Sequence, residues 1–145
     1  MNFKNVTVAG SGVLGYQIAF QTAFHGFKVS VYDINDEVLA KAKAKFFELS
    51  ECYKRDINAT QEQLDNTFNN LSYYSNLAEA VQDADLVIEA VPEDVGIKTD
   101  FYEKFNLLRN IFCEKTILPF SIATGSCWVK SPSDLNSLLQ QADSA

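Results

Sequence analysis

A glycine-rich turn near the N-terminus is the feature that most limits the folds open to this chain. Residues 10–15 read Gly-Ser-Gly-Val-Leu-Gly, which matches the pattern G-x-G-x-x-G, and they follow a short β-branched run at 6–9. Such a run is typical of a buried parallel strand. Apolar residues then recur at helical spacing as far as Gly26, which is suited to end a helix, and a valine-rich strand is expected at 28–32. The order strand, glycine turn, helix, strand predicts a βαβ unit.

The same alternation continues along the chain. Asn35 is a candidate N-cap for a long helix with an apolar stripe formed by Leu39, Ala42, Phe46, Leu49 and Tyr53. Further helices are predicted at 60–70, 77–81 and 97–112, and further strands at 71–75, 85–91 and within 116–124. The last helix is marked by Ile97, Phe101, Phe105, Leu108 and Phe112. Alternating elements of this kind pair their strands in parallel through right-handed crossovers. We therefore expect one α/β domain over residues 1–145, with a doubly wound, mostly parallel sheet of the Rossmann type.

Composition and charge exclude several classes of function. The chain has 145 residues and a net charge of −7, which disfavours a nucleic-acid partner. Cys52, Cys113 and Cys127 form no C-x-x-C pair, so neither a zinc site nor a disulfide framework is indicated and no metal is expected. No run approaches the roughly 18 apolar residues of a membrane span, and the N-terminus lacks a secretory apolar region. These observations predict a cytoplasmic protein without a membrane partner.

Each glycine of the turn has a physical role in binding a dinucleotide. Gly10 permits the tight turn after the strand, Gly12 lets a pyrophosphate approach the main chain, and Gly15 lets the helix pack close to the strand. The helix that follows offers unpaired N–H groups and the positive end of its dipole to the phosphates. Asp33 lies at the end of the second strand, 18 residues beyond Gly15, where a carboxylate can accept hydrogen bonds from ribose hydroxyls and repel a 2′-phosphate. The pattern therefore predicts binding of NAD rather than NADP.

The turn has two other possible interpretations. Glycines after a strand often serve packing alone, and the pattern G-x-G-x-x-G by itself is weak evidence of a ligand. An ATP-binding phosphate loop is disfavoured, because the turn lacks the Gly-Lys-Ser/Thr ending of that motif. The strand before the turn, the helix after it and Asp33 together favour the dinucleotide.

At this point the sequence resembles the 3-hydroxyacyl-CoA dehydrogenases, most closely their 3-hydroxybutyryl-CoA-type members. The resemblance rests on residues 6–15, on Val-Tyr-Asp at 31–33, and above all on Asp-Ala-Asp-Leu-Val-Ile-Glu-Ala-Val-Pro-Glu-Asp at 83–94. It runs from residue 1 to about 118, with an echo at 131–135. The resemblance implies an oxidoreductase of fatty-acid metabolism that uses NAD to interconvert 3-hydroxyacyl-CoA and 3-oxoacyl-CoA.

The resemblance also implies further cofactor-binding residues. In the family a Glu and a Lys five residues apart lie beside the cofactor after the fourth strand, and Glu93 and Lys98 match those positions. With Gly10, Ser11, Gly12, Val13, Leu14, Gly15 and Asp33 they complete the expected cofactor set. The residues alone allow a plainer interpretation, in which Glu93 caps the next helix and Lys98 is a solvated charge.

The sequence departs from the family pattern after residue 118. Family members continue into an Asn-Ser/Thr-Ser segment whose last serine contacts substrate and nicotinamide. Here residues 123–127 read Ala-Thr-Gly-Ser-Cys, so Cys127 takes the serine position by strict alignment, and Ser126 takes it only with a one-residue shift. Residues 119–122 look inserted. The segment from about 119 to the C-terminus is therefore expected to be atypical.

The family's catalytic His and the Glu that orients it have no counterpart in the sequence. General base catalysis of alcohol oxidation needs such a group, and the only histidine, His25, lies at the end of the first helix. The family's helical C-terminal domain is also absent. We therefore expect a truncated dehydrogenase that keeps its cofactor half and lacks catalytic residues of its own. A stand-alone dinucleotide-binding or sensing module and an oxidoreductase for another hydroxy acid remain alternatives. The partners expected are an acyl-CoA, in the complete enzyme, and a second copy of the chain in a homodimer.

Overall fold

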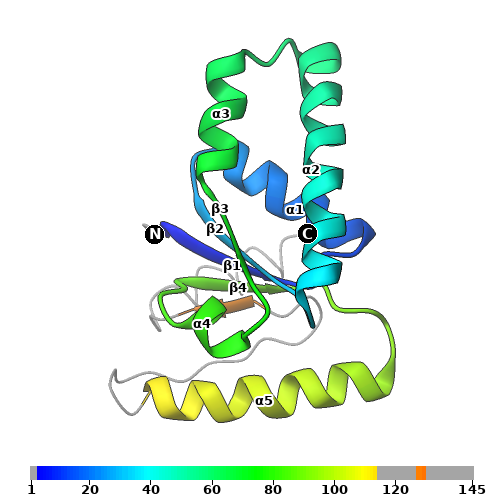
Figure 1. The fold of residues 1–145 in the computed structure, drawn as a ribbon. Helices are drawn as coiled ribbons and strands as arrows, with labels where there is room; N and C mark the ends of the chain where they lie inside the picture. The colour runs from blue at the N-terminus through cyan, green and yellow to red at the C-terminus, as the bar shows by residue number, and fades with distance from the viewer. Residues whose placement is uncertain (1–2, 114–126, 130–145) are drawn as a thin grey trace, which may run out of the picture.

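The computed structural model describes residues 3–113 and 127–129 of the chain. Its centre is a twisted sheet of five strands in the order β3-β2-β1-β4-β5 (Figure 1). Four strands run parallel, and the short β5 pairs with β4 in the antiparallel direction. The strands are β1 (Asn5–Ala9), β2 (Lys28–Tyr32), β3 (Leu71–Tyr74), β4 (Leu86–Glu89) and β5 (Cys127–Val129). The predicted α/β class and mostly parallel Rossmann-type sheet are confirmed.

Helices cover both faces of this sheet, which makes a three-layer sandwich (Figure 1). One face packs against α1, α2 and α3, and the other packs against α4 and α5. The α2 and α3 helices form a hairpin that extends away from the sheet, and α5 lies along the opposite side (Figure 1). The helices are α1 (Val13–Phe24), α2 (Asp36–Ile57), α3 (Gln61–Asn69), α4 (Leu77–Val81) and α5 (Val95–Cys113).

The alternation of side chains along the strands divides the core into two clusters. On β2, Val29 and Val31 are buried against the α1 side, while Tyr32 packs on the other side against Phe101 of α5. The α1 side is centred on Phe20, whose ring contacts Phe46, Tyr53 and Phe68. Each strand of a doubly wound sheet must bury both faces, which explains the near-continuous apolar runs in the sequence.

Helix ends are fixed by local polar residues. The Asn35 side chain accepts a hydrogen bond of 2.9 Å from the Val38 N–H, as expected of an N-cap. The α2 helix ends at Asn58, which adopts a left-handed conformation (φ 55°) and turns the chain into α3. Gly26 has a φ of +91° and follows α1, so its predicted role as the residue after a helix end is confirmed.

Two details differ from the expectations. The β4 strand is shorter than the predicted strand 85–91. Ile97 is 47% exposed although it was placed on the apolar stripe of the last helix, because it lies in the first turn of α5, before the helix packs on the sheet. The strand predicted within 116–124 lies outside the described residues. In the part of the chain that the structure describes, no helix is long and apolar enough to span a membrane.

Candidate cofactor-binding site

The order of the strands places a topological switch point at the carboxyl ends of β1 and β4, where sheets of this kind form a crevice. From β1 the chain continues to β2 and β3 on one side of β1, and then crosses to β4 on the other side of β1. The connections that follow β1 and β4 therefore run in opposite directions and leave space between them. Ligands of open α/β sheets bind at such a switch point. The glycine turn follows β1 there, and residues 90–93 follow β4.

Two glycines of the turn are required by the fold itself. Gly10 has a φ of +103°, and a Cβ there would lie 2.5 Å from the carbonyl oxygen of Ala90. A Cβ on Gly15 would lie 1.8 Å from the Gly10 carbonyl oxygen. The main chain just after β4 and the first turn of α1 therefore both pack directly on the turn, as the packing interpretation of these glycines requires.

Gly12 is different, because packing does not require it. A Cβ built on Gly12 would meet no heavy atom within 4 Å, and its φ of −67° is open to any residue. Gly12 is the N-cap of α1, no side chain caps that helix end, and Val13 and Leu14 beside it are exposed. The site therefore offers open space, main-chain N–H groups and the positive end of a helix dipole, which together suit a phosphate group.

Asp33 lies across the turn and is held by it. One carboxylate oxygen, Oδ2, accepts hydrogen bonds from the Ser11 N–H at 2.7 Å and from the Ser11 hydroxyl at 2.5 Å. The other oxygen, Oδ1, accepts the Ile34 N–H at 2.7 Å. Each carboxylate oxygen can accept about two hydrogen bonds, so Oδ1 retains acceptor capacity. The structure thus joins Ser11 of the turn to Asp33 at the end of β2.

Glu93 and Lys98 meet on the β4 side of the crevice. The Lys98 ammonium lies 2.6 Å from a Glu93 carboxylate oxygen and 3.5 Å from one of Glu89. The hydrogen bond to Glu93, with the charge of Glu89, raises the pKa of Lys98 above its ordinary value. The plainer interpretation of this pair is wrong for Glu93, because Asp94 caps α5 and accepts the Ile97 N–H at 3.0 Å. The Lys98 charge is partly exposed and is paired with Glu93.

Sequence reasoning missed Glu89, the last residue of β4. Its carboxylate accepts the Val91 N–H at 2.9 Å and the Tyr102 hydroxyl at 3.0 Å, in addition to its contact with Lys98. The signal was present in the sequence: a carboxylate that ends an otherwise apolar strand must find partners, because burial of an unpaired charge is costly.

The remaining predicted residues are placed only in part. Cys127 begins β5 and pairs with Ile88 of β4, so its main chain lies near the carboxyl end of β4. Ser126 lies outside the described residues. Within residues 3–113, no group of three or more His, Cys, Asp or Glu side chains is arranged to hold a metal ion.

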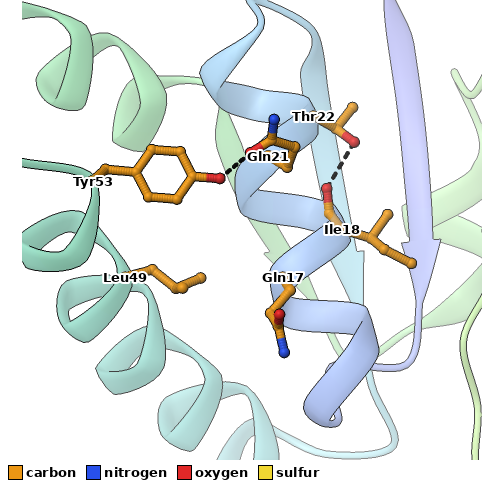
Figure 2. A pocket seen from close by; sticks show the side chains of 6 residues that line it. All are labelled: Gln17, Ile18, Gln21, Thr22, Leu49 and Tyr53. Atoms are coloured by element: carbon orange, nitrogen blue, oxygen red, sulfur yellow. Dashed lines mark hydrogen bonds between the residues drawn. The ribbon is translucent and has the colours of Figure 1, made fainter. Parts of the chain in front are cut away.

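A separate cavity of about 420 Å³ lies between α1 and α2, away from the crevice (Figure 2). The Tyr53 hydroxyl donates a hydrogen bond to Gln21 across it, and Leu49 points into it from α2 (Figure 2). None of the predicted cofactor residues lines this cavity. Its residues are Gln17, Ile18, Gln21, Thr22, Leu49 and Tyr53.

A family model and two curated relatives that match this chain carry the names of hydroxyacyl-CoA or hydroxybutyryl-CoA dehydrogenases. Residues 5–125 match the family model of the 3-hydroxyacyl-CoA dehydrogenase NAD-binding domain. The chain is 36% identical over 121 residues to a probable 3-hydroxybutyryl-CoA dehydrogenase of Bacillus subtilis, covering 81% of this chain and 40% of that protein. It is 31% identical over 121 residues to a mitochondrial hydroxyacyl-coenzyme A dehydrogenase of Rattus norvegicus, covering 78% of this chain and 38% of that protein.

Solved structures agree with the sequence matches. A diketoreductase superposes with a TM-score of 0.71 at 48% identity, over 74% of this chain and 38% of that one. A 3-hydroxybutyryl-CoA dehydrogenase of Escherichia coli superposes with a TM-score of 0.67 at 30% identity, over 74% of this chain and 23% of that one.

The similarity covers only part of the length of each relative. The chain spans about two fifths of the length of the curated relatives it matches. The relatives include mitochondrial and bacterial proteins, so the cytoplasmic location stays a prediction. By the match over residues 5–125 and the sheet that carries it, the chain belongs to the 3-hydroxyacyl-CoA dehydrogenase family and forms the family's NAD-binding domain.

Proposed function

We propose that this chain binds NAD in the crevice between β1 and β4 and supplies the cofactor half of an enzyme that interconverts 3-hydroxyacyl-CoA and 3-oxoacyl-CoA. The observation that carries the proposal is the open space at Gly12, which lies between two glycines whose space is filled. A packing turn explains Gly10 and Gly15 but gives no reason for the glycine at 12.

The turn would hold the pyrophosphate, and Asp33 would hold the adenosine ribose. The main chain of residues 10–15 and the N-terminus of α1 supply N–H groups, while Asp33 accepts from the ribose hydroxyls through its remaining lone pairs. A carboxylate fixed by Ser11 also repels a 2′-phosphate, which favours NAD over NADP.

Glu93 and Lys98 would lie beside the nicotinamide end of the cofactor. Both follow β4, at the end of the crevice opposite β2 and Asp33. Their pairing keeps one positive and one negative group at the place where hydroxyl groups of the nicotinamide ribose would need a donor and an acceptor. Bound NAD supplies the hydride acceptor for oxidation of the 3-hydroxyl group.

The described residues place no histidine beside the crevice to act as the general base of this oxidation. His25, the only histidine of the sequence, is exposed at the C-cap of α1 and contacts Gln21. The twelve residues of α1 separate it from the crevice by about 18 Å at 1.5 Å per residue. We therefore propose that this chain binds the cofactor but turns over little or no substrate alone.

Calorimetric titration of the chain with NADH tests the binding proposal. Asp33→Ala should weaken NADH affinity about tenfold or more and should narrow the preference for NADH over NADPH. Asp65→Ala is the matched control, because it removes the same charge from the exposed surface of α3. Failure of the wild-type chain to bind NADH would reject the cofactor proposal and leave the family membership intact.

Turnover is tested by mixing the chain with NADH and acetoacetyl-CoA and following the absorbance of NADH. Sustained oxidation at an ordinary enzyme rate contradicts the proposal that the site is incomplete. A stand-alone binding or sensing module also predicts binding without turnover. The two are separated by the native gene: a helical domain with a His-Phe-x-Asn-Pro segment encoded in the same reading frame favours the dehydrogenase.

A second candidate substrate class is favoured by one comparison. The structure that is 48% identical is a diketoreductase, and its title describes catalysis on dicarbonyl compounds. A panel containing acetoacetyl-CoA and dicarbonyl compounds without CoA, tested on this chain and on any longer protein that contains it, distinguishes the two classes. The proposed homodimer is checked separately, by light scattering of the purified chain.

A further inference from the structure

Glu89 ends β4 beneath the N-terminal half of α5, with its side chain only 7% exposed. Val87, two residues earlier, points to the same face of the sheet and packs in the core cluster with Phe101 of α5. Glu89 is also the register partner of Ala9, the residue before the glycine turn. The carboxylate therefore lies under the rim of the crevice, where its charge must be compensated.

The two carboxylates beside Lys98 are held very differently. Glu93 is the nearer partner, but its side chain is 88% exposed, so it can rotate away at little cost. Glu89 is fixed by the Val91 N–H and the Tyr102 hydroxyl, and only its remaining capacity is directed to the Lys98 ammonium. Lys98 itself is 28% exposed, which leaves part of its ammonium group accessible from the crevice.

From this asymmetry we propose that Glu89 is a positioning residue for the cofactor. It holds Lys98 at the rim of the crevice, and Tyr102 in turn holds Glu89. Glu93 is the exchangeable partner, which releases Lys98 when a ligand arrives. The inference rests on the proposed function. It gives Glu89, which is outside the expected cofactor set, the role of holding Lys98, the only basic residue between residues 79 and 103, in place.

Simple electrostatics and positioning predict opposite effects of removing the Glu89 charge. NADH is an anion, so a merely electrostatic role for Glu89 means that Glu89→Gln binds NADH more tightly. If Glu89 orients Lys98, the same substitution frees the ammonium and weakens binding. Glutamine keeps the size of the side chain. Its oxygen can accept from the Val91 N–H, and its NH2 group can donate to the Tyr102 hydroxyl oxygen in place of the second carboxylate oxygen, so the substitution removes the charge at nearly constant shape.

The test is a double-mutant cycle on the intact chain, read by calorimetric titration with NADH. Glu89→Gln should weaken NADH affinity about fivefold, and Lys98→Met should weaken it at least as much. In the Lys98→Met background, Glu89→Gln should change affinity less than about twofold, because the group it positions is gone. Glu103→Gln is the control, since it removes an exposed carboxylate of the same helix.

Each outcome decides the inference. Unchanged or tighter NADH binding by Glu89→Gln overturns it, as does an equal loss in the Lys98→Met background. Tyr102→Phe, which removes only the hydroxyl that holds Glu89, should weaken binding in the same direction and provides a second variant if Glu89→Gln does not fold. If wild-type chain and Lys98→Met both bind NADH and differ, the proposed function stands and only the role of Glu89 is at issue. If the wild-type chain does not bind NADH, both fail.

Discussion

Substituting Gly12 by alanine separates the needs of the fold from those of the cofactor. The structure predicts that this added methyl group meets no atom of the protein, because nothing lies within 4 Å of the Cβ position. The backbone there (φ −67°, ψ −167°) is accessible to alanine. The same position is where a pyrophosphate must approach the main chain to reach the N–H groups of α1.

The two expected effects differ in size and can be worked out separately. Alanine is a poorer N-cap than glycine by roughly 0.5 kcal/mol, and the reduced freedom of the unfolded chain returns about as much. The free energy of unfolding should therefore change by less than about 0.5 kcal/mol, a shift in Tm of about 2 °C or less. Binding should suffer far more, because a methyl group that displaces the pyrophosphate costs at least about 1.4 kcal/mol, or tenfold in Kd.

Gly15→Ala is the matched comparison in the same turn. Its methyl group would overlap the Gly10 carbonyl oxygen at 1.8 Å, so it should cost about 3 kcal/mol or more and lower the Tm by several degrees. Thermal unfolding followed by circular dichroism and calorimetric titration with NADH measure the two effects. An undiminished NADH affinity in Gly12→Ala, or a Tm loss equal to that of Gly15→Ala, would refute the assignment of the open space at Gly12 to the pyrophosphate.

Further predictions concern stability. Thr7→Val should lower the free energy of unfolding by about 1–3 kcal/mol in urea titrations, because the buried Thr7 hydroxyl donates a 2.6 Å hydrogen bond to the carbonyl of Ala80. Thr22→Val, at a half-buried position, is the control and should lower it less. Phe20→Ala should cost about 3–5 kcal/mol, since its fully buried ring contacts three other aromatic rings, and a loss below 1 kcal/mol contradicts this packing. Burial raises the pKa of Tyr73 from 10.0 to about 12, so its contribution to stability should be lost as pH rises from 10 to 12, and Tyr73→Phe should flatten that decline in denaturation measured against pH.

The sequence predicts best those strands, turns and helix ends whose structure depends on residues close together in the chain. The strand at 6–9, the turn, α1 and the cap at Asn35 follow from periodicity and from side chains that bond within four residues. The pattern alone could not show which glycines the packing requires, and the structure shows that it requires Gly10 and Gly15 but not Gly12.

Features that depend on how distant segments pack could not be predicted. The partners of Lys98 depend on where α5 lies relative to β4. The family resemblance placed Lys98 and Glu93 beside the cofactor, but the sequence did not predict the ion pairs of Lys98 and missed Glu89. The antiparallel direction of β5 is equally non-local, because a three-residue strand has no pattern that fixes its neighbour. Ile97 fits a helical stripe but is exposed, since periodicity does not tell where a helix first contacts the sheet.

The contact between Gly10 and Ala90 bears on redesign of the cofactor preference. There the turn after β1 and the end of β4 touch through main-chain atoms, so the floor of the crevice consists of backbone whose shape no side chain sets. Substitutions can remodel such a floor only by disrupting the fold. The rim is different, since Asp33 and the 75% exposed Ile34 lie beyond the end of β2 and contribute side chains. Engineering of this domain toward another dinucleotide should therefore concentrate its variation at positions 33 and 34 and keep the glycines fixed.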